Sequence, residues 1–336
     1  MGREAGRVAA SPLRARLFPI NRCAVRNAAA RWFLQGCRFD AAGRRRHHRG
    51  VYQERAVRLP TGVTLSAAVS PGPADRTLLV IHGGPDWDHT YLREPLSGLG
   101  REYRLVLPDL RGCGRSTNGL ADAEYTPDAA VGDLLALLDR LDISRAAVLG
   151  FSFGGFIAQR LLVAAPERVS RLIVASSSVL PVPPDAFAGW AERAERVAAE
   201  TAVWADAMLT GPAFTRAAAM AGARANVWRP ESLPDYLRRL SEVHFTAEWL
   251  RPYRAGMLPS PWLTDPIAGL SAAGRPVLLL HGEQDMTFPA VLAGQAAARI
   301  PLATALVLAE AGHMAHIDDP RAWLAAVRRF LAGAGA

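Results

Sequence analysis

The sequence predicts an α/β fold in which helices flank a mostly parallel central sheet. From Val51 onward, short apolar runs rich in β-branched residues alternate with helical stretches, and glycines and prolines separate them. Such alternation is typical of parallel sheets, because every parallel strand needs a crossover connection. Half of the 336 residues are hydrophobic, which is enough for a large buried core. The expected strands are 63–69, 77–82, 103–107, 146–150, 172–176, 277–281 and 305–308.

Helical periodicity appears between these runs. Residues 127–141 place Ala130, Leu134, Leu137, Leu138 and Leu141 on one stripe. Residues 155–164 follow a strand directly, and 321–331 close the chain. Residues 179–264 break the rhythm, since they are rich in Ala, Trp and charged residues at helical spacing and have prolines at both borders. We therefore expect a core of residues 51–178 and 265–336 with a helical lid, 179–264, inserted into it.

Charge separates the first 50 residues from the rest. They contain 12 arginines against only Glu4 and Asp40, whereas the remaining residues contain 27 basic and 29 acidic side chains. We expect residues 1–50 to be a basic, disordered extension and expect no nucleic-acid partner for the body. A nucleic-acid or membrane-binding arm and a targeting peptide are the alternative interpretations of residues 1–50.

Cysteine content and hydropathy exclude two further classes of protein. Cys23, Cys37 and Cys113 are odd in number and widely spaced, which excludes a disulfide scaffold. No segment approaches the roughly 18 consecutive apolar residues of a membrane-spanning helix, and none near the N-terminus has signal-peptide character. We expect a cytoplasmic protein without a membrane span; the sequence indicates no oligomeric state.

The sharpest motif is Gly150-Phe151-Ser152-Phe153-Gly154, which follows an expected strand and precedes an expected helix. This is a G-x-S-x-G pattern in a strand–turn–helix context. A sharp turn there lifts the serine hydroxyl above the sheet, and the flanking side chains must be absent where the strand and helix backbones approach each other. The motif therefore predicts Ser152 as a nucleophile.

A serine hydroxyl needs a histidine to accept its proton and a carboxylate to orient that histidine. Asp285 follows the expected strand 277–281, with Glu283 as its competitor two residues away. His313 lies between the last expected strand and the last helix, and we interpret His316 as a packing or surface residue. The chain order Ser, Asp, His agrees with the order expected for a nucleophile of this kind.

Two backbone N–H groups are needed to stabilise an oxyanion. Phe153 follows the serine directly and supplies one candidate. Gly84, in His82-Gly83-Gly84-Pro85 after the strand 77–82, supplies the other, because a residue without a side chain lets its amide approach a substrate. No His, Cys and carboxylate cluster has metal-ligand spacing, so we predict neither a metal nor an organic cofactor.

With these residues assembled, residues 51–333 resemble the α/β-hydrolase superfamily. The His82–Pro85 run, Asp88-His89 and the stretch from Arg111 to Ser116 are similar to proline iminopeptidases and their relatives. In those enzymes lid carboxylates hold the substrate's α-ammonium group, and the resemblance implies Glu242 as that anchor and Trp87 as a second substrate-binding residue. Leu110 and Phe153 depart from the glutamine and tryptophan usual in that family.

The predicted function is hydrolysis through an acyl-enzyme, with Ser152, His313 and Asp285 acting on a small molecule or a short peptide. A proline iminopeptidase-like aminopeptidase is the first interpretation. A carboxylesterase or lactonase acting on small acyl esters is the alternative, and a non-catalytic ligand-binding member of the fold is the third. A serine at position 152 disfavours the related enzymes that use an aspartate nucleophile.

Overall fold

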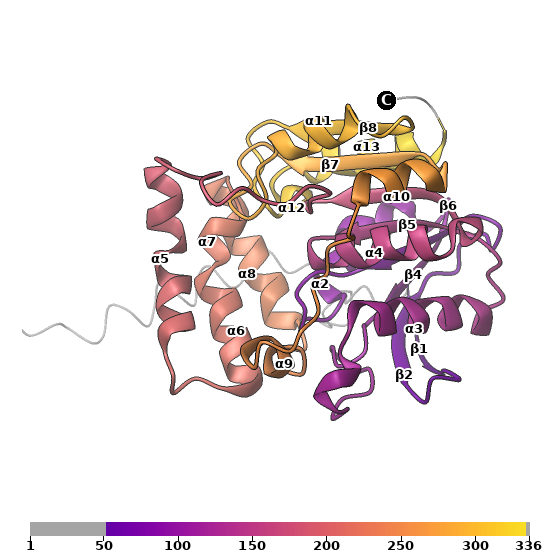
Figure 1. Cartoon of the computed structure of the whole chain (residues 1–336), viewed down its shortest axis with the longest axis horizontal. Helices are drawn as coiled ribbons and strands as arrows, with labels where there is room; N and C mark the ends of the chain where they lie inside the picture. The colour runs from indigo at the N-terminus through magenta and orange to yellow at the C-terminus, as the bar shows by residue number, and fades with distance from the viewer. Residues whose placement is uncertain (1–51, 334–336) are drawn as a thin grey trace, which may run out of the picture. The chain divides into compact units, whose positions relative to one another are not determined.

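The computed structural model describes residues 52–333, so the predicted basic extension, 1–50, lies outside the described residues. Eight strands form one sheet in the order β1-β2-β4-β3-β5-β6-β7-β8 (Figure 1). β1 pairs antiparallel with β2, and β2 pairs antiparallel with β4, while every other neighbouring pair is parallel. The mostly parallel sheet is confirmed. The strands are β1 Gln53–Arg58, β2 Thr64–Val69, β3 Thr77–Ile81, β4 Arg104–Pro108, β5 Ala146–Phe151, β6 Val169–Ala175, β7 Val277–Gly282 and β8 Ala303–Leu308.

The sequence did not predict strand β1. Its six residues, QERAVR, are exposed at all positions except one that is half-buried. A strand at the edge of a sheet with little buried surface carries no apolar run, and charged side chains there are typical of edges that avoid pairing with other chains. Pairing with β2, from Gln53 opposite Val69 to Arg58 opposite Thr64, therefore defines the strand, not its own composition.

Alternate residues of the central strands face two separate apolar layers. In β3, Leu79 and Ile81 pack in one layer, and Leu78 and Val80 pack in the other. Helices α3, α4, α10 and α11 cover the first layer, and α2, α12 and α13 cover the second. Their bounds are α2 Thr90–Leu96, α3 Pro127–Arg140, α4 Phe153–Ala164, α10 Pro266–Ala273, α11 Val291–Ala297, α12 Ala315–Asp318 and α13 Pro320–Leu331. Both faces are covered, which explains why β3 to β7 read as apolar runs.

Three of these helices begin with the same local signal. α3, α10 and α13 each have proline as the first helical residue and a preceding side chain, Thr126, Asp265 or Asp319, that accepts a hydrogen bond from the third backbone N–H. Proline tolerates this position because its missing N–H would have no helical partner, and the cap satisfies another free donor. The sequence predicted α3 and α13 to within one residue at either end.

The segment between β6 and α10 carries helices that stand to one side of the sheet, at the left in Figure 1. α8 buries Tyr236, Arg239 and Leu240, whereas α5 has no buried residue. We call residues 179–264 the inserted segment. Its α-helices are α5 Ala191–Ala205, α6 Gly211–Ala221, α7 Ala223–Asn226, α8 Leu233–Glu242 and α9 Leu250–Arg254.

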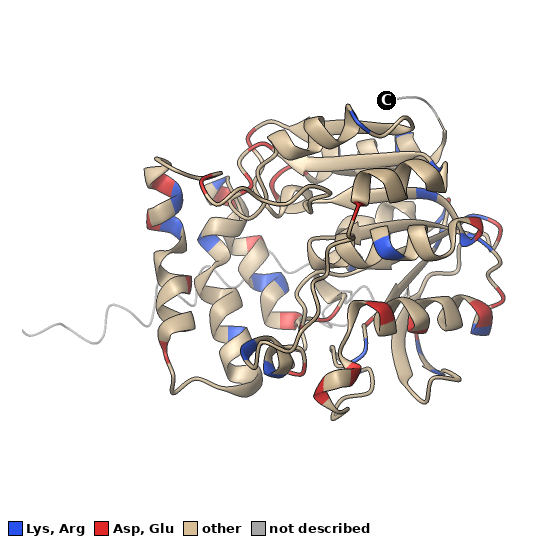
Figure 2. Cartoon of the chain, in the orientation of Figure 1, with Lys and Arg blue, Asp and Glu red and all other residues tan. Residues whose placement is uncertain are grey.

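Charged residues of both signs are interspersed over the sheet domain and the inserted segment, in agreement with the balanced charge of the sequence after residue 50 (Figure 2). Within residues 52–333, none of the helices combines the length and the apolar character that crossing a membrane requires.

Candidate active site

Ser152 occupies the sharp turn between β5 and α4. Its backbone φ is 52° and ψ is −121°, a conformation that few residues other than glycine adopt. The turn brings α4 so close to β5 and β3 that a Cβ at Gly150 would overlap the backbone of Gly154, and a Cβ at Gly154 would overlap the carbonyl oxygens of Ile81 and His82. The two glycines of the motif are therefore required by the close approach of the backbones.

The structure brings together the three side chains that the sequence selected. The Nε2 atom of His313 lies 3.1 Å from the Oγ of Ser152, and its Nδ1 atom lies 2.9 Å from the Oδ2 of Asp285. Asp285 and His313 are buried, whereas Ser152 is half-buried and lines a cavity. The three residues follow β5, β7 and β8, which are parallel strands whose carboxyl ends lie at one edge of the sheet.

Asp285 is held as a carboxylate. Its Oδ1 accepts hydrogen bonds from the backbone N–H groups of Thr287 at 2.7 Å and Phe288 at 3.0 Å, and the Nε2 of His281 lies 3.1 Å from its Oδ2. Burial alone would raise the pKa of Asp285, but His313 and His281 lower it well below its usual range. The competing residue Glu283 is exposed.

The two predicted oxyanion donors line the same cavity as Ser152. Phe153 is the first residue of α4, so its N–H has no acceptor within the helix. Gly84 has a φ of 116°, which residues with side chains rarely adopt. The preceding residue, Gly83, has no room for a Cβ, which would lie 2.9 Å from the Cβ of Ser152.

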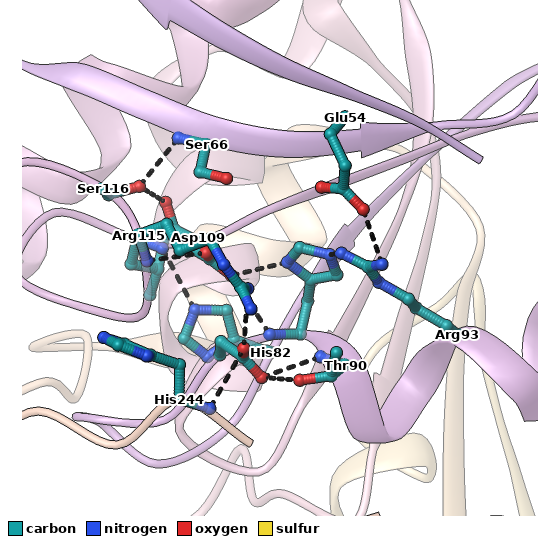
Figure 3. Close-up of polar contacts among 12 residues, drawn as sticks. Glu54, Ser66, His82, Thr90, Arg93, Asp109, Arg115, Ser116 and His244 are labelled. Carbon is teal, nitrogen blue, oxygen red and sulfur yellow. Dashed lines mark hydrogen bonds and ion pairs between the residues drawn. The ribbon is translucent and has the colours of Figure 1, made fainter. Parts of the chain in front are cut away.

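A network of polar side chains, most of them buried, is connected to the loop that carries Gly84 (Figure 3). The Nε2 of His82 accepts a hydrogen bond from the N–H of Leu110 at 3.0 Å, and its Nδ1 donates to the carbonyl of Gly83 at 2.7 Å. Burial lowers the pKa of His82. The Nδ1 of His89 lies 2.5 Å from Asp109. Both ring nitrogens of His82 are thus engaged by the backbone, so His82 braces the loop.

A cavity of about 590 Å³ opens above Ser152 and is mostly apolar. The sheet domain contributes Gly84, Trp87, Ser152, Phe153 and His313 to its lining. The inserted segment contributes Glu200, Trp204, Phe214, Trp249 and Tyr253, among others. Trp87 packs edge-on against Tyr91 and Phe245, with ring centroids 5.5 Å apart in each case. An apolar cavity with a few convergent polar groups is the usual form of a small-molecule site.

Comparison with known proteins agrees with this geometry. A family model described as "alpha/beta hydrolase fold" matches residues 76–320. The chain belongs to the α/β-hydrolase family. The 2-hydroxymuconate semialdehyde hydrolase of Pseudomonas sp. (strain CF600) is 30% identical over 277 residues, which cover 77% of this chain and 88% of that protein.

Solved structures of α/β-hydrolases show the same fold. A proline iminopeptidase-related protein from Thermus thermophilus is 26% identical, with a TM-score of 0.63 over 84% of this chain and 97% of the other. An esterase from Thermogutta terrifontis is 23% identical, with a TM-score of 0.64 over 84% of this chain and all of the other. The resemblance to the superfamily and to proteins related to proline iminopeptidases is thus confirmed.

Glu242 requires a correction, because the structure places it away from the cavity of this α/β-hydrolase. It lies at the end of α8 with its side chain 56% exposed, and its Oε1 accepts a hydrogen bond from Arg238 at 3.2 Å. A charged pair four residues apart on a solvated helix face explains this position. The four-residue similarity that pointed to Glu242 could not distinguish the outer face of α8 from the inner one.

The carboxylate that does line the cavity from the inserted segment is Glu200, on α5. Burial raises the pKa of Glu200, while a hydrogen bond with Trp204 and the charges of His313 and Arg193 oppose the rise. Glu200 was missed because it lies in an Ala-rich helix whose polar and apolar residues give no sign of which face meets the cavity. Its proximity to His313 follows from the tertiary structure alone.

Two further buried side chains near the site, His316 and Asp86, have shifted pKa values. Both ring nitrogens of His316 lack a hydrogen-bond partner, and the ring packs edge-on against Phe151 at 4.9 Å. Burial lowers its pKa well below the usual value, so His316 is a neutral packing residue. Asp86, in the loop that carries Gly84, is 3% exposed, and burial raises its pKa to about 6 although backbone N–H donors oppose this.

Proposed function

We propose that this α/β-hydrolase is a serine hydrolase that cleaves small acyl substrates through an acyl-enzyme. Ser152 attacks the substrate carbonyl while the Nε2 of His313 takes its proton. Asp285 keeps Nδ1 of His313 protonated and stabilises the imidazolium that forms. The protonated His313 then donates its proton to the leaving group, which departs and leaves the acyl group on Ser152. His313 next takes a proton from water as the water attacks the acyl carbon, and it returns that proton to Ser152 as the acid product leaves. These steps need neither a metal nor an organic cofactor.

The hydrogen-bonded series from Ser152 through His313 to Asp285 is the observation that carries this proposal. Both distances are short enough for direct proton transfer and orientation. The low pKa of Asp285 means that the carboxylate stays ionised while the imidazole changes its charge. The N–H groups of Gly84 and Phe153 would hold the oxyanion of the tetrahedral intermediate, and the inserted segment would act as a lid that excludes water.

Replacement of Ser152 by alanine tests the mechanism. We expect Ser152→Ala to lose at least about a thousandfold in kcat for p-nitrophenyl acetate, because the triad acts as a unit. A chain that begins at Val51 should keep full activity, since every residue assigned here lies after it. Unchanged turnover in Ser152→Ala would rule out this mechanism and would favour a ligand-binding protein.

For the substrate, we propose an acyl group that carries a free amine, as in a proline iminopeptidase-like aminopeptidase. The support is Glu200, whose carboxylate lies within the cavity and close enough to His313 for their charges to interact. A substrate ammonium group placed between Glu200 and Ser152 would gain an ion pair in a partly desolvated site. The similarity to the Thermus thermophilus protein also favours this assignment.

The test of the amine proposal compares two glutamates of the inserted segment. We expect Glu200→Gln to raise KM for proline β-naphthylamide by about tenfold or more, the effect of losing about 1.4 kcal/mol of binding, and to leave p-nitrophenyl acetate hydrolysis unchanged. Glu242→Gln is the matched control, because its side chain is exposed and lies outside the cavity. Equal effects of the two substitutions on the amide would contradict the assignment.

Hydrolysis of uncharged esters or lactones is the second candidate. The mostly apolar lining of the cavity, with Trp204, Phe214 and Trp249 among its walls, favours it. If proline amides are inert in the wild type while simple esters and lactones turn over rapidly, this candidate replaces the aminopeptidase.

A further inference from the structure

Asp86 connects the loop that carries Gly84 to the inserted segment. Its carboxylate is buried and is bound mainly by backbone N–H donors: the N–H of Trp249 lies 3.0 Å from Oδ1 and the N–H of Leu250 lies 2.9 Å from Oδ2. The hydroxyl of Thr246 lies 3.1 Å from Oδ1 and 2.7 Å from the carbonyl oxygen of Gly112, so it divides its one proton between the two acceptors. The backbone carbonyl of Asp86 accepts a fourth hydrogen bond, from the N–H of Thr246 at 2.9 Å. A loop of the sheet domain and a stretch of the inserted segment are thus joined at one residue.

The backbone at Asp86 is itself constrained. Its φ is 69°, in the left-handed region, which costs a residue with a side chain about 1 kcal/mol or more. Gly84, two residues earlier, also has a positive φ. The hydrogen bonds to the inserted segment therefore hold a loop that would otherwise relax toward more populated backbone angles.

Trp249 extends this connection to the second oxyanion donor. Its indole N–H donates to the carbonyl of Arg111 at 2.7 Å, and its fully buried ring packs edge-on against Phe153 with centroids 5.5 Å apart. The backbone N–H of Trp249 is bound by Asp86, and the ring of Trp249 packs against Phe153, whose N–H is the proposed second oxyanion donor. One carboxylate therefore connects to both sides of the proposed oxyanion hole.

We propose that Asp86 is a positioning residue that holds the two oxyanion donors, Gly84 and Phe153, in register with the hydroxyl of Ser152. The inference rests on the proposed function, because it concerns the stabilisation of the tetrahedral intermediate. It makes the inserted segment part of the catalytic geometry, in addition to its contribution to the cavity wall. Asp86 also lines the cavity, but both of its carboxylate oxygens are bound by backbone N–H groups of the inserted segment, so we assign it an action through Gly84 and Phe153.

The experiment replaces Asp86 by asparagine and measures turnover per active site. Asparagine tolerates the left-handed backbone as well as aspartate does, so the substitution changes mainly the hydrogen bonding. Its amide NH2 cannot accept from a backbone N–H, so at least one donor loses its partner. Diethyl p-nitrophenyl phosphate, which labels the serine and releases one p-nitrophenol, counts the competent sites.

We expect kcat/KM for p-nitrophenyl acetate, per titrated site, to fall by about tenfold to a hundredfold, the size of effect expected from a misplacement of about 1 Å. The change in KM should stay within about twofold. The inhibition constant of phenylboronic acid, which forms a tetrahedral adduct with the serine, should rise by the same factor as kcat/KM falls. A residue that only stabilised the fold would change the number of titrated sites but not these ratios.

The matched control is Asp88→Asn. Asp88 lies in the same loop and is equally buried, and it also binds the inserted segment, through the N–H of His244 at 3.2 Å. Its other partners are the N–H of Thr90 at 3.0 Å and the guanidinium of Arg115 at 3.3 Å, both of which Figure 3 labels. We expect Asp88→Asn to leave turnover per site and the phenylboronic acid constant within about twofold of the wild type.

Four outcomes overturn the inference. If turnover per site in Asp86→Asn equals that of the wild type, the further inference fails and the proposed function stands. The same holds if Asp88→Asn loses as much turnover per site as Asp86→Asn. Absence of Ser152-dependent turnover in the wild type overturns it together with the proposed function. If Asp86→Asn does not fold, Thr246→Val, which removes one donor and keeps both N–H groups, should show about a threefold fall in kcat/KM at constant KM; no fall there overturns the inference.

Discussion

The sheet edge and the inserted segment enclose the same cavity but differ in how they are built. Ser152, Asp285 and His313 follow buried or partly buried parallel strands, and the turn at Ser152 is fixed by contacts of backbone with backbone. In contrast, α5 carries Glu200 and Trp204 on a helix without a single buried residue, and Trp204 is 44% exposed.

Under the proposed mechanism, this difference predicts a division of roles. Reacting groups need positions fixed within a fraction of an ångström, which a close-packed sheet edge supplies. Groups that recognise a substrate tolerate looser packing, and a loosely packed helix can change its residues without disturbing the sheet. Substitutions at the sheet edge should therefore change kcat or the fold, and substitutions on α5 should change KM.

The largest expected effect is at Asp285. We expect Asp285→Asn to lower kcat for p-nitrophenyl acetate by about ten thousandfold, because an amide favours the wrong tautomer of His313. Stopped assays on purified protein measure the loss. Glu283→Gln, an exposed neighbour two residues earlier, is the control and should be unchanged. A loss of less than tenfold in Asp285→Asn would show that the carboxylate is not needed.

The next largest effect is on the stability of the fold at the turn that holds Ser152. Gly154→Ala should lower the free energy of unfolding by about 3 kcal/mol, since the new Cβ meets the backbone carbonyls of Ile81 and His82, which cannot move aside. Gly132→Ala on α3 is the matched control: its Cβ meets no atom within 4 Å, so alanine should stabilise the helix by about 0.5–1 kcal/mol. Urea denaturation measures both, and an unaffected Gly154→Ala would contradict the packing argument.

On the inserted segment, Trp204→Ala should raise KM by about tenfold with kcat within twofold, because it removes apolar contact that substrate and transition state share. Trp190 precedes the same helix but does not line the cavity, so Trp190→Ala should leave KM unchanged. If kcat falls by the same factor as KM rises, Trp204 contributes to catalysis as well as to substrate binding. The proposed difference between the sheet edge and α5 would then be wrong.

Acid stability should also depend on the sheet edge. Because the pKa of Asp285 is lower in the folded than in the unfolded protein, its ionisation stabilises the fold fully above about pH 5, and this contribution is lost as the pH falls. Between pH 7 and pH 3 the stability advantage of the wild type over Asp285→Asn should shrink by about 1 kcal/mol, as the unfolded carboxyl takes up its proton. Guanidinium unfolding at the two pH values measures the difference; a constant advantage would mean that the pKa is not lowered.

The smallest effect is expected at the surface of α8. Arg238 pairs with Glu94, Asp235 and Glu242, but its side chain is 45% exposed. Solvent and salt screen such pairs, so Arg238→Ala should lower the free energy of unfolding by about 0.5 kcal/mol or less. The loss should shrink further in 1 M NaCl, and a loss above about 2 kcal/mol would show that α8 is held more firmly than its exposure indicates.

The residues that follow strands were the ones that sequence analysis located. Ser152, Asp285 and His313 each come shortly after an apolar run, and the chain order restricted the choice among several histidines and acids. β1 was missed because an exposed edge strand has no apolar pattern. Glu242 was chosen in place of Glu200 because short similarity and helical spacing do not tell which side of a helix in the inserted segment meets the cavity.

The sequence by itself determined the parallel sheet, the turn at Ser152 and the identity of the groups brought to the sheet edge, because these depend on local signals: apolar runs, glycines at a close approach and residues just beyond strand ends. Only the tertiary structure decided which helix faces line the cavity and which buried carboxylate, Asp86, joins the Gly84 loop to residues 246–250. Those contacts join residues more than 150 positions apart, and their geometry depends on the packing of whole elements, which no local pattern records.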